Sequence, residues 1–151
     1  MSPKRDIRLT PEEQVQFLRE GGKAALATVD KDGFPHVVAM SYLARDGAIY
    51  MTSYAKAQKV VNARRNPKVA VMIETGDRYS EFHGLMIRGR CEIIEDAAEV
   101  ERVIRESAAR RARGEAPPNP GALASAPKRV VLKITPEKTA SWDHRKLGGA
   151  Y

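Results

Sequence analysis

The feature that most constrains the fold of this chain is a succession of short strand-like segments separated by tight turns. Asp30–Gly33 and Arg45–Gly47 each end in glycine, which adopts positive φ without steric cost, and each contains aspartate, which favours turns. The segments around these turns, residues 23–29, 35–43 and 48–53, have the lengths and patterns of strands. The arrangement predicts an antiparallel three-stranded meander at the start of the domain.

Three further segments also predict strands. Residues 68–74 are almost entirely apolar, so we expect them to be buried on both faces. Residues 80–94 alternate around Gly84 and Gly89, which predict bulges or close approach of another backbone. Residues 128–135 alternate as well. Six strands joined mainly by short turns predict a mainly β, α+β domain that is built on a six-stranded antiparallel barrel.

Two helices are predicted beside these strands. Thr10 with Glu13 three residues later forms a capping box, and Asp96 with Glu99 repeats that spacing before an apolar stripe. Pro136 is expected to end the last strand. The predicted organisation is a single domain over residues 1–151, with an N-terminal helix at 11–21, an inserted helix at 96–113 and a C-terminal tail at 137–151.

Residues 49–67 change from a strand pattern to a helix pattern, and the helix ends at Pro67. Thr52 and Ser53 stand where the pattern changes, and a lysine follows one turn into the helix. Unpaired N–H groups at a helix start attract anions, and a lysine adds a positive charge. The stretch therefore fits a phosphate-binding site, although the solvated basic face of a surface helix is the simpler interpretation of the local pattern.

Composition narrows the classes of function. The net charge of +7 favours anionic partners, but the basic residues are spread out and no nucleic-acid-binding motif accompanies them, so nucleic acid is not the expected partner. No apolar run reaches the length of about 18 residues that a membrane span needs, and the first residues lack the apolar core of an export signal. The single cysteine, Cys91, suits the reducing cytoplasm. Cys91 and the three histidines show no metal-ligand spacing, so no metal site is expected.

The order of elements and several short motifs match a known superfamily. The motifs are Asp-Gly-Phe-Pro-His-Val-Val at 32–38, Asp-Gly-Ala-Ile-Tyr at 46–50, Gln-Lys-Val-Val-Asn-Ala-Arg-Arg-Asn-Pro at 58–67 and His-Gly-Leu-Met-Ile-Arg-Gly at 83–89. With them, the chain resembles the pyridoxamine 5′-phosphate oxidase-like superfamily of split β-barrel proteins over residues 11–136. This superfamily includes oxidoreductases that depend on flavin or deazaflavin.

The resemblance implies a split barrel of the FMN-binding type, with flanking helices, and a homodimer that holds its cofactor between the subunits. FMN and coenzyme F420 both fit. Lys59 is supported by the spacing Lys-x-x-Asn-x-x-x-Asn-Pro over residues 59–67. The resemblance places seven residues at the cofactor: Met40 and Ser41 beside the ring system, Thr52 and Ser53 near the ribityl chain or phosphate, Gln58 and Lys59 at the phosphate, and Trp142 on the cofactor or at the dimer interface.

The implied function is transfer of a hydride between the flavin or deazaflavin and a small unsaturated substrate. His36, His83 and His144 are candidates for acid or substrate contact, with His144 beside Arg145 the most suggestive, although histidines in such positions are more often structural. The C-terminal segment lacks the Arg-Leu-x-Pro pattern of pyridoxamine phosphate oxidases, so oxidation of vitamin B6 is not expected. A non-catalytic protein that binds flavin, deazaflavin or haem is the alternative, and a basic adaptor that binds nucleic acid without a cofactor is the third hypothesis.

Overall fold

A computed structural model describes residues 5–111 and 120–149 of the chain. It contains seven strands rather than six, because the segment predicted at 35–43 divides at Tyr42 into two strands. The strands are β1 (Lys23–Val29), β2 (Pro35–Ser41), β3 (Leu43–Arg45), β4 (Ala48–Tyr54), β5 (Lys68–Thr75), β6 (His83–Ile94) and β7 (Arg129–Asp143).

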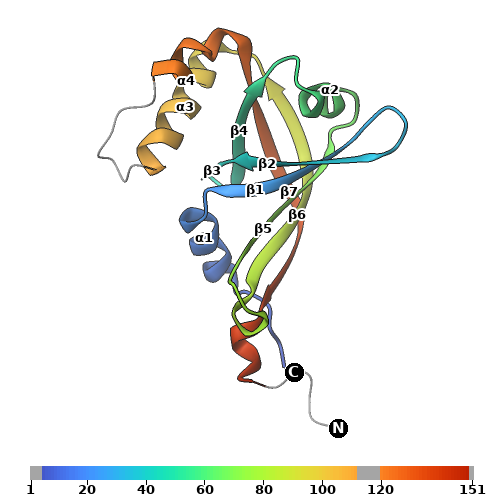
Figure 1. Cartoon of the computed structure of the whole chain (residues 1–151), viewed down its shortest axis with the longest axis vertical. Coiled ribbons are helices and arrows are strands. Elements are labelled where there is room, and N and C mark those ends of the chain that lie inside the picture. The colour runs from blue at the N-terminus through green and yellow to red at the C-terminus, as the bar shows by residue number, and fades with distance from the viewer. Residues whose placement is uncertain (1–4, 112–119, 150–151) are drawn as a thin grey trace.

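All seven strands belong to one sheet in the order β2-β1-β5-β6-β7-β4-β3, and every neighbouring pair is antiparallel. The sheet curls into an open barrel, in which the long strands β6 and β7 run along the molecule and the β1–β2 hairpin crosses them (Figure 1). The prediction of a mainly β antiparallel barrel with flanking helices is therefore confirmed.

Within residues 5–111 and 120–149, four α-helices and three short 3₁₀ turns accompany the sheet. They are α1 (Pro11–Glu20), α2 (Gln58–Arg65), α3 (Ala97–Arg111), α4 (Pro120–Ala124), η1 (Tyr79–Glu81), η2 (Ala126–Lys128) and η3 (His144–Leu147). Helix α1 begins with the predicted capping box, in which the Glu13 N–H donates to the Thr10 hydroxyl and the Thr10 N–H donates to the Glu13 carboxylate. The Glu99 N–H donates to the Asp96 carboxylate in the same way at the start of α3. None of the described helices has the length and hydropathy needed to cross a membrane.

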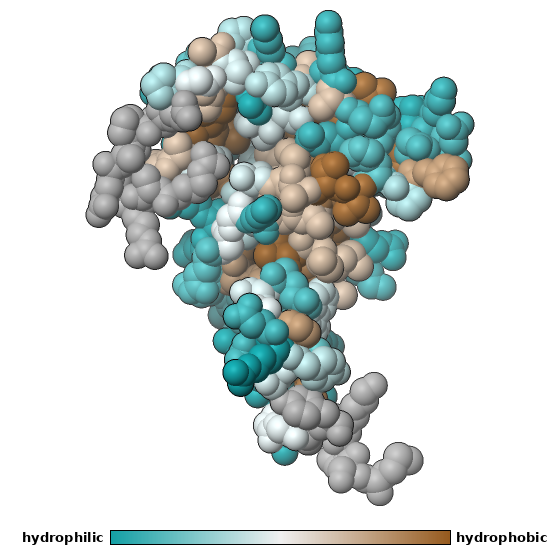
Figure 2. Space-filling model, viewed as in Figure 1, coloured by the Kyte–Doolittle hydropathy of each residue, from teal (hydrophilic) through white to brown (hydrophobic). Residues whose placement is uncertain are grey.

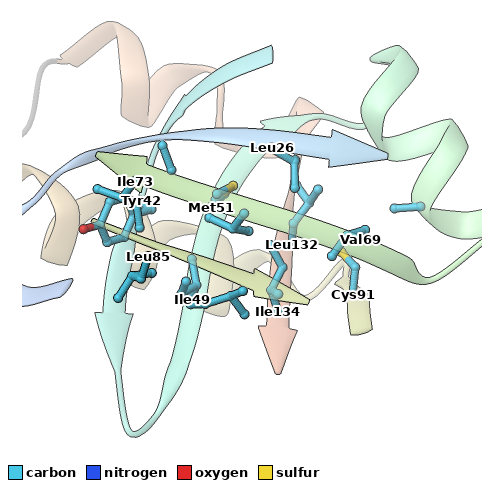
Figure 3. Close-up of a cluster of buried hydrophobic side chains, with 14 of the residues drawn as sticks. Leu26, Tyr42, Ile49, Met51, Val69, Ile73, Leu85, Cys91, Leu132 and Ile134 are labelled. Atoms are coloured by element: carbon cyan, nitrogen blue, oxygen red, sulfur yellow. The ribbon is translucent and has the colours of Figure 1, made fainter. Parts of the chain in front are cut away.

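Two apolar clusters hold the fold together. The larger one fills the inside of the curled sheet and includes Leu26, Met51 and Leu132 (Figure 3). The smaller one lies between β4, β7 and α3, and includes Tyr50 and Val103. Because successive side chains of a strand point to opposite faces, Tyr50 and Met51 belong to different clusters. The inserted helix α3 therefore covers the outside of the sheet where β4 meets β7.

Two expectations about strands are wrong. Strand β5 is not buried on both faces, since Val71 is fully buried whereas Met72 is 44% exposed. The last strand does not stop at Pro136, so residues 137–143 are the second half of β7 rather than part of a tail. Pro136 is accepted because the register between β6 and β7 shifts beside it, between Arg88 and Gly89, and a proline at a bulge removes no regular ladder bond.

The inserted helix predicted at 96–113 is described from Ala97 to Arg111, and its last two predicted residues lie outside the described part of the chain. The same holds for the first four and the last two residues of the predicted domain.

Candidate functional site

The barrel is not closed, and the split in it creates the candidate site. Strand β2 pairs only with β1. Strand β4 pairs with β7 along Ile49–Tyr54, but its other neighbour, β3, reaches only as far as Tyr50. Beyond Tyr50, the outer edge of β4 therefore has no strand partner among the described residues. Free strand edges offer unpaired backbone N–H and C=O groups, which can bind a ligand that has donors and acceptors along one side.

A pocket of about 290 Å³ lies between these two free edges. Helices α3 and α4 provide its remaining walls, because the smaller apolar cluster fixes both helices against β4 and β7. The described residues that line the pocket are Ala39, Met40 and Ser41 of β2, Met51 and Thr52 of β4, Ile104 and Ser107 of α3, Ala122 of α4 and Arg129 of β7. The structure thus brings together three of the predicted cofactor residues: Met40, Ser41 and Thr52.

The pocket combines apolar walls with few polar groups. Three hydroxyls line it, from Ser41, Thr52 and Ser107, together with one cation, Arg129. No aspartate or glutamate is among its described lining residues. Ser53, the neighbour of Thr52, is not among the lining residues. It is 4% exposed and pairs in register with the buried Val130, so its side chain faces the inside of the barrel.

Helix α2 starts four residues after β4 ends and contains Gln58 and Lys59. Lys59 makes no hydrogen bond or ion pair with any described residue, so its ammonium group is available to a ligand. Gln58 is already engaged, because its side-chain amide donates to the Asn62 side chain at 2.6 Å. Lys59 is therefore free to bind a ligand, whereas Gln58 would first have to give up its hydrogen bond to Asn62.

The inner face of α2 is held by a buried polar network. Asn62 is fully buried and donates to the Thr28 hydroxyl at 3.1 Å, and Arg65 donates to the Val29 carbonyl oxygen at 3.2 Å. Opposite Thr28 on β2 stands His36, whose Nδ1 is buried without a hydrogen-bond partner among the described residues. Moving α2 away from β1 would leave the buried Asn62 amide and Thr28 hydroxyl unpaired, which is costly. Their hydrogen bond therefore fixes α2 against β1.

The other three predicted residues lie at the opposite end of the molecule, where η3 forms the lower tip (Figure 1). The Trp142 indole N–H donates to the Glu74 carboxylate at 2.7 Å. His144 Nδ1 is 2.7 Å from the Tyr79 carbonyl oxygen. Arg145 donates twice to Asp143, and these hydrogen bonds hold the pKa of the Asp143 carboxyl below its usual range. Within one protomer, none of the three lines the split pocket.

In the described part of the chain, the other reactive groups do not form a second centre. Cys91 is buried in the core, and burial raises the pKa of its thiol to about 12, so it is not a nucleophile at neutral pH. Among the described residues there is no group of three or more histidine, cysteine, aspartate or glutamate side chains that could hold a metal ion.

Besides Ala39 and Met51, which adjoin predicted residues, sequence reasoning missed four residues of the pocket: Ile104, Ser107, Ala122 and Arg129. Ile104, Ser107 and Arg129 come from segments whose own pattern indicates only helix or strand, and Ala122 comes from the proline-rich stretch 114–127, whose pattern predicts a loop. Their place in the pocket depends on how α3, α4 and β7 pack against the free edge of β4, for which no local signal exists in the sequence.

Solved structures with the same architecture are known. The conserved hypothetical protein Rv2991 from Mycobacterium tuberculosis is 35% identical, with a TM-score of 0.86, over 100% of this chain and 95% of that one. A protein named F420 reductase is 26% identical, with a TM-score of 0.69, over 87% of this chain and 98% of its own. An FAD-binding protein from Mesorhizobium loti, at 24% identity and a TM-score of 0.68 over 88% of this chain and 94% of that one, supports the fold alone.

The search of curated proteins gave no match. The family model described as pyridoxamine 5′-phosphate oxidase, however, matches residues 10–143, which include the whole sheet and the split between its two free edges. The chain therefore belongs to the pyridoxamine 5′-phosphate oxidase family.

Proposed function

We propose that this protein binds FMN or coenzyme F420 in the split pocket and acts, as a homodimer, as an oxidoreductase that transfers a hydride to or from a small unsaturated substrate. The observation that carries the proposal is the pocket between the free edges of β2 and β4, which offers backbone groups and hydroxyls but no described carboxylate. The F420 reductase that is similar in structure supports the same class of cofactor.

The residues present fit such a cofactor. Flavin and deazaflavin rings carry carbonyl and N–H groups along one side, which match the free backbone edge around Met40 and Ser41. Thr52 can donate a hydrogen bond from the opposite edge. Lys59, at the start of α2, can meet the phosphate, because the helix start and the ammonium group both favour an anion.

When bound, the ring system supplies the redox chemistry, and the protein supplies position and electrostatics. The walls contributed by Ile104 and Ala122 would limit the access of water to the pocket from the side of α3 and α4. The Ser41, Thr52 and Ser107 hydroxyls orient ligands within the pocket and can relay a proton from solvent. This arrangement needs no dedicated protein acid.

A second copy of the chain is part of the proposal. Within one protomer, the pocket lies far from Trp142, His144 and Arg145. These residues can therefore reach a cofactor only across a subunit interface. The outer face of the sheet offers such an interface. Its apolar band, which we call the outer band, consists of Ala25, Ala27, Val37, Ala39, Ala70, Met72, Met86 and Ala140.

Every residue of the outer band is exposed or half-buried in the protomer, and none is charged. Figure 2 shows apolar side chains gathered over the middle of the molecule, where β1, β2 and β5 cross in Figure 1. Contiguous apolar patches on a protein surface usually mark binding sites. Two-fold symmetry allows one such patch to bind its own copy, since each patch meets an identical one.

The test is a titration of the purified protein with FMN and with coenzyme F420, followed by visible absorbance and fluorescence. We expect one of the two to bind with a Kd in the micromolar range or below, and the reduced form to be oxidised by an unsaturated substrate. Binding without turnover by any substrate would support the alternative of a non-catalytic flavin or deazaflavin carrier. Binding of neither cofactor would overturn the proposal, and haem would then be tested next.

A further inference from the structure

Arg129 is the charged residue of the split pocket to which the proposed function gives no role. It lines the pocket together with Thr52 and Ser107, and no described lining residue carries a compensating negative charge. A half-buried guanidinium without a counter-charge is disfavoured unless something binds it, because burial removes part of its hydration.

The side chain of Arg129 is held in one orientation. Its Nε donates to the Ser125 hydroxyl at 2.8 Å, and that hydroxyl donates to the Ala122 carbonyl oxygen at 2.8 Å. The guanidinium carbon lies 4.3 Å from the centre of the Tyr54 ring, in stacking contact. A guanidinium that is fixed by a hydrogen bond on one nitrogen and by an aromatic face is organised before its ligand arrives.

The two terminal nitrogens of Arg129 make no hydrogen bond or ion pair with any described residue. Other ordered arginines of this chain differ: Arg45 reaches both Glu99 and Glu106, and Arg145 donates twice to Asp143. The free nitrogens of a guanidinium match the two oxygens of a carboxylate or phosphate, and such paired hydrogen bonds are strong and directional. Arg129 is thus prepared for an oxyanion that the protein itself does not supply.

We propose that Arg129 binds a carboxylate or similar oxyanion of the substrate, so that the enzyme acts on anionic unsaturated compounds. The inference rests on the proposed function and narrows its substrate class. The anion is distinct from the cofactor phosphate, because Lys59, the residue assigned to that phosphate, does not line the pocket that contains Arg129.

The experiment compares anions with their neutral amides on the cofactor-loaded protein. Benzoate and crotonate are titrated beside benzamide and crotonamide, and binding is followed through the visible spectrum of the bound cofactor. Wild-type protein should bind each carboxylate at least tenfold more tightly than its amide. Arg129→Met should remove this preference, and Arg129→Lys should keep part of it, because lysine retains the charge but loses the paired geometry. Arg105→Met, which removes an exposed arginine of α3, is the matched control and should change nothing.

A second measurement distinguishes a role of Arg129 at the substrate from a role at the cofactor phosphate. The ratio of the FMN and riboflavin dissociation constants should be the same in Arg129→Met and wild type. A selective loss of FMN affinity would show that Arg129 serves the cofactor phosphate, and it would overturn the inference. Equal binding of carboxylates and amides by the wild type would also overturn it.

Failure of the proposed function gives a different result. If the wild type binds neither FMN nor F420, the carboxylate and amide titrations are repeated by calorimetry on the protein alone. A carboxylate preference that disappears in Arg129→Met would then keep the anion site while the cofactor proposal falls.

Discussion

At the scale of single residues, two lysines of the basic stretch after β4 have different expected roles, although only three positions separate them. Lys59 is half-buried near the start of α2, and Lys56 is exposed in the turn before it. Neither lysine has a hydrogen-bond or ion-pair partner among the described residues. The two ammonium groups therefore differ mainly in where they lie. This pair therefore provides a variant and a matched control for the phosphate assignment.

Lys59→Met should weaken FMN binding by about 10- to 100-fold, because a hydrogen bond to a charged group contributes about 1.5–3 kcal/mol. Riboflavin, which lacks the phosphate, should bind the variant and the wild type equally. Lys56→Met should leave both affinities unchanged. Fluorescence titration measures all of these constants, and an unchanged FMN affinity in Lys59→Met would remove the phosphate assignment.

Asp143 leads to a prediction about stability and pH. The carboxyl is 2% exposed at the residue level and accepts hydrogen bonds from the side chain and backbone N–H of Arg145, which lower its pKa in the folded state. A carboxyl with a lowered folded pKa stabilises the protein above its unfolded pKa of about 3.9. This stabilisation is lost as the pH falls through the folded pKa.

Asp143→Asn should therefore lower the free energy of unfolding by about 1 kcal/mol at pH 7, near the lower end for such bonds because Arg145 is 54% exposed. The difference from wild type should begin to shrink below about pH 4, where the unfolded chain binds a proton at Asp143, and should vanish below the lower folded pKa. Urea unfolding at pH 7, 5 and 3.5 measures this. Asp6→Asn is the control, since Asp6 makes the same type of pair with Arg8 on the exposed surface, and it should have no measurable effect.

At the scale of elements, the close pairing of β6 and β7 beside their register shift depends on Gly89. A Cβ atom at this position would lie 2.5 Å from the Thr135 carbonyl oxygen, and a backbone atom cannot move aside as a flexible side chain can. Gly89→Ala should destabilise the protein by about 1–3 kcal/mol, the usual cost of overpacking. Gly22→Ala, where nothing lies within 4 Å of the added carbon, should be close to neutral. Thermal and urea unfolding measure the stability of the two variants. If both were as stable as the wild type, the close backbone contact at Gly89 would not be needed for the fold.

The sequence predicts those elements whose signal lies in a few neighbouring residues, and it does not predict features that depend on distant strands. The capping box at Thr10 and the close approach at Gly89 were readable, because both arise from the chemistry of a few neighbouring residues. The continuation of β7 past Pro136 was not, since it depends on a register shift in β6, a distant strand. Arg129 was missed for the same reason: strand pairing with Tyr54, rather than its own neighbours, places it at the pocket.

At the scale of the whole molecule, the exposure of Met72 contrasts with the apolar pattern of its strand, which predicted burial on both faces. A homodimer through the outer band would bury this second face and reconcile the two. Met72→Glu should then dissociate the dimer while leaving the protomer folded, because the side chain is 44% exposed in the protomer. Sedimentation velocity would report the change in mass.

Val61→Glu is the matched control for the dimer. Val61 has nearly the same exposure, 43%, but lies on α2 away from the outer band. It should leave the sedimentation coefficient unchanged. A wild-type protein that sediments as a monomer at micromolar concentration would exclude the dimer.

The split between β2 and β4 has a consequence beyond ligand binding. Unpaired strand edges are places where chains stick to one another and aggregate, and natural barrels avoid this by closing. Under the proposed function, a ligand in the gap would take the place of the missing strand, so it would also protect the folded chain. A ligand at 100 times its Kd adds about 2.7 kcal/mol to the stability of the state that binds it. The cellular lifetime of this protein should therefore follow the supply of its ligand, with the empty form being the one that aggregates or is degraded.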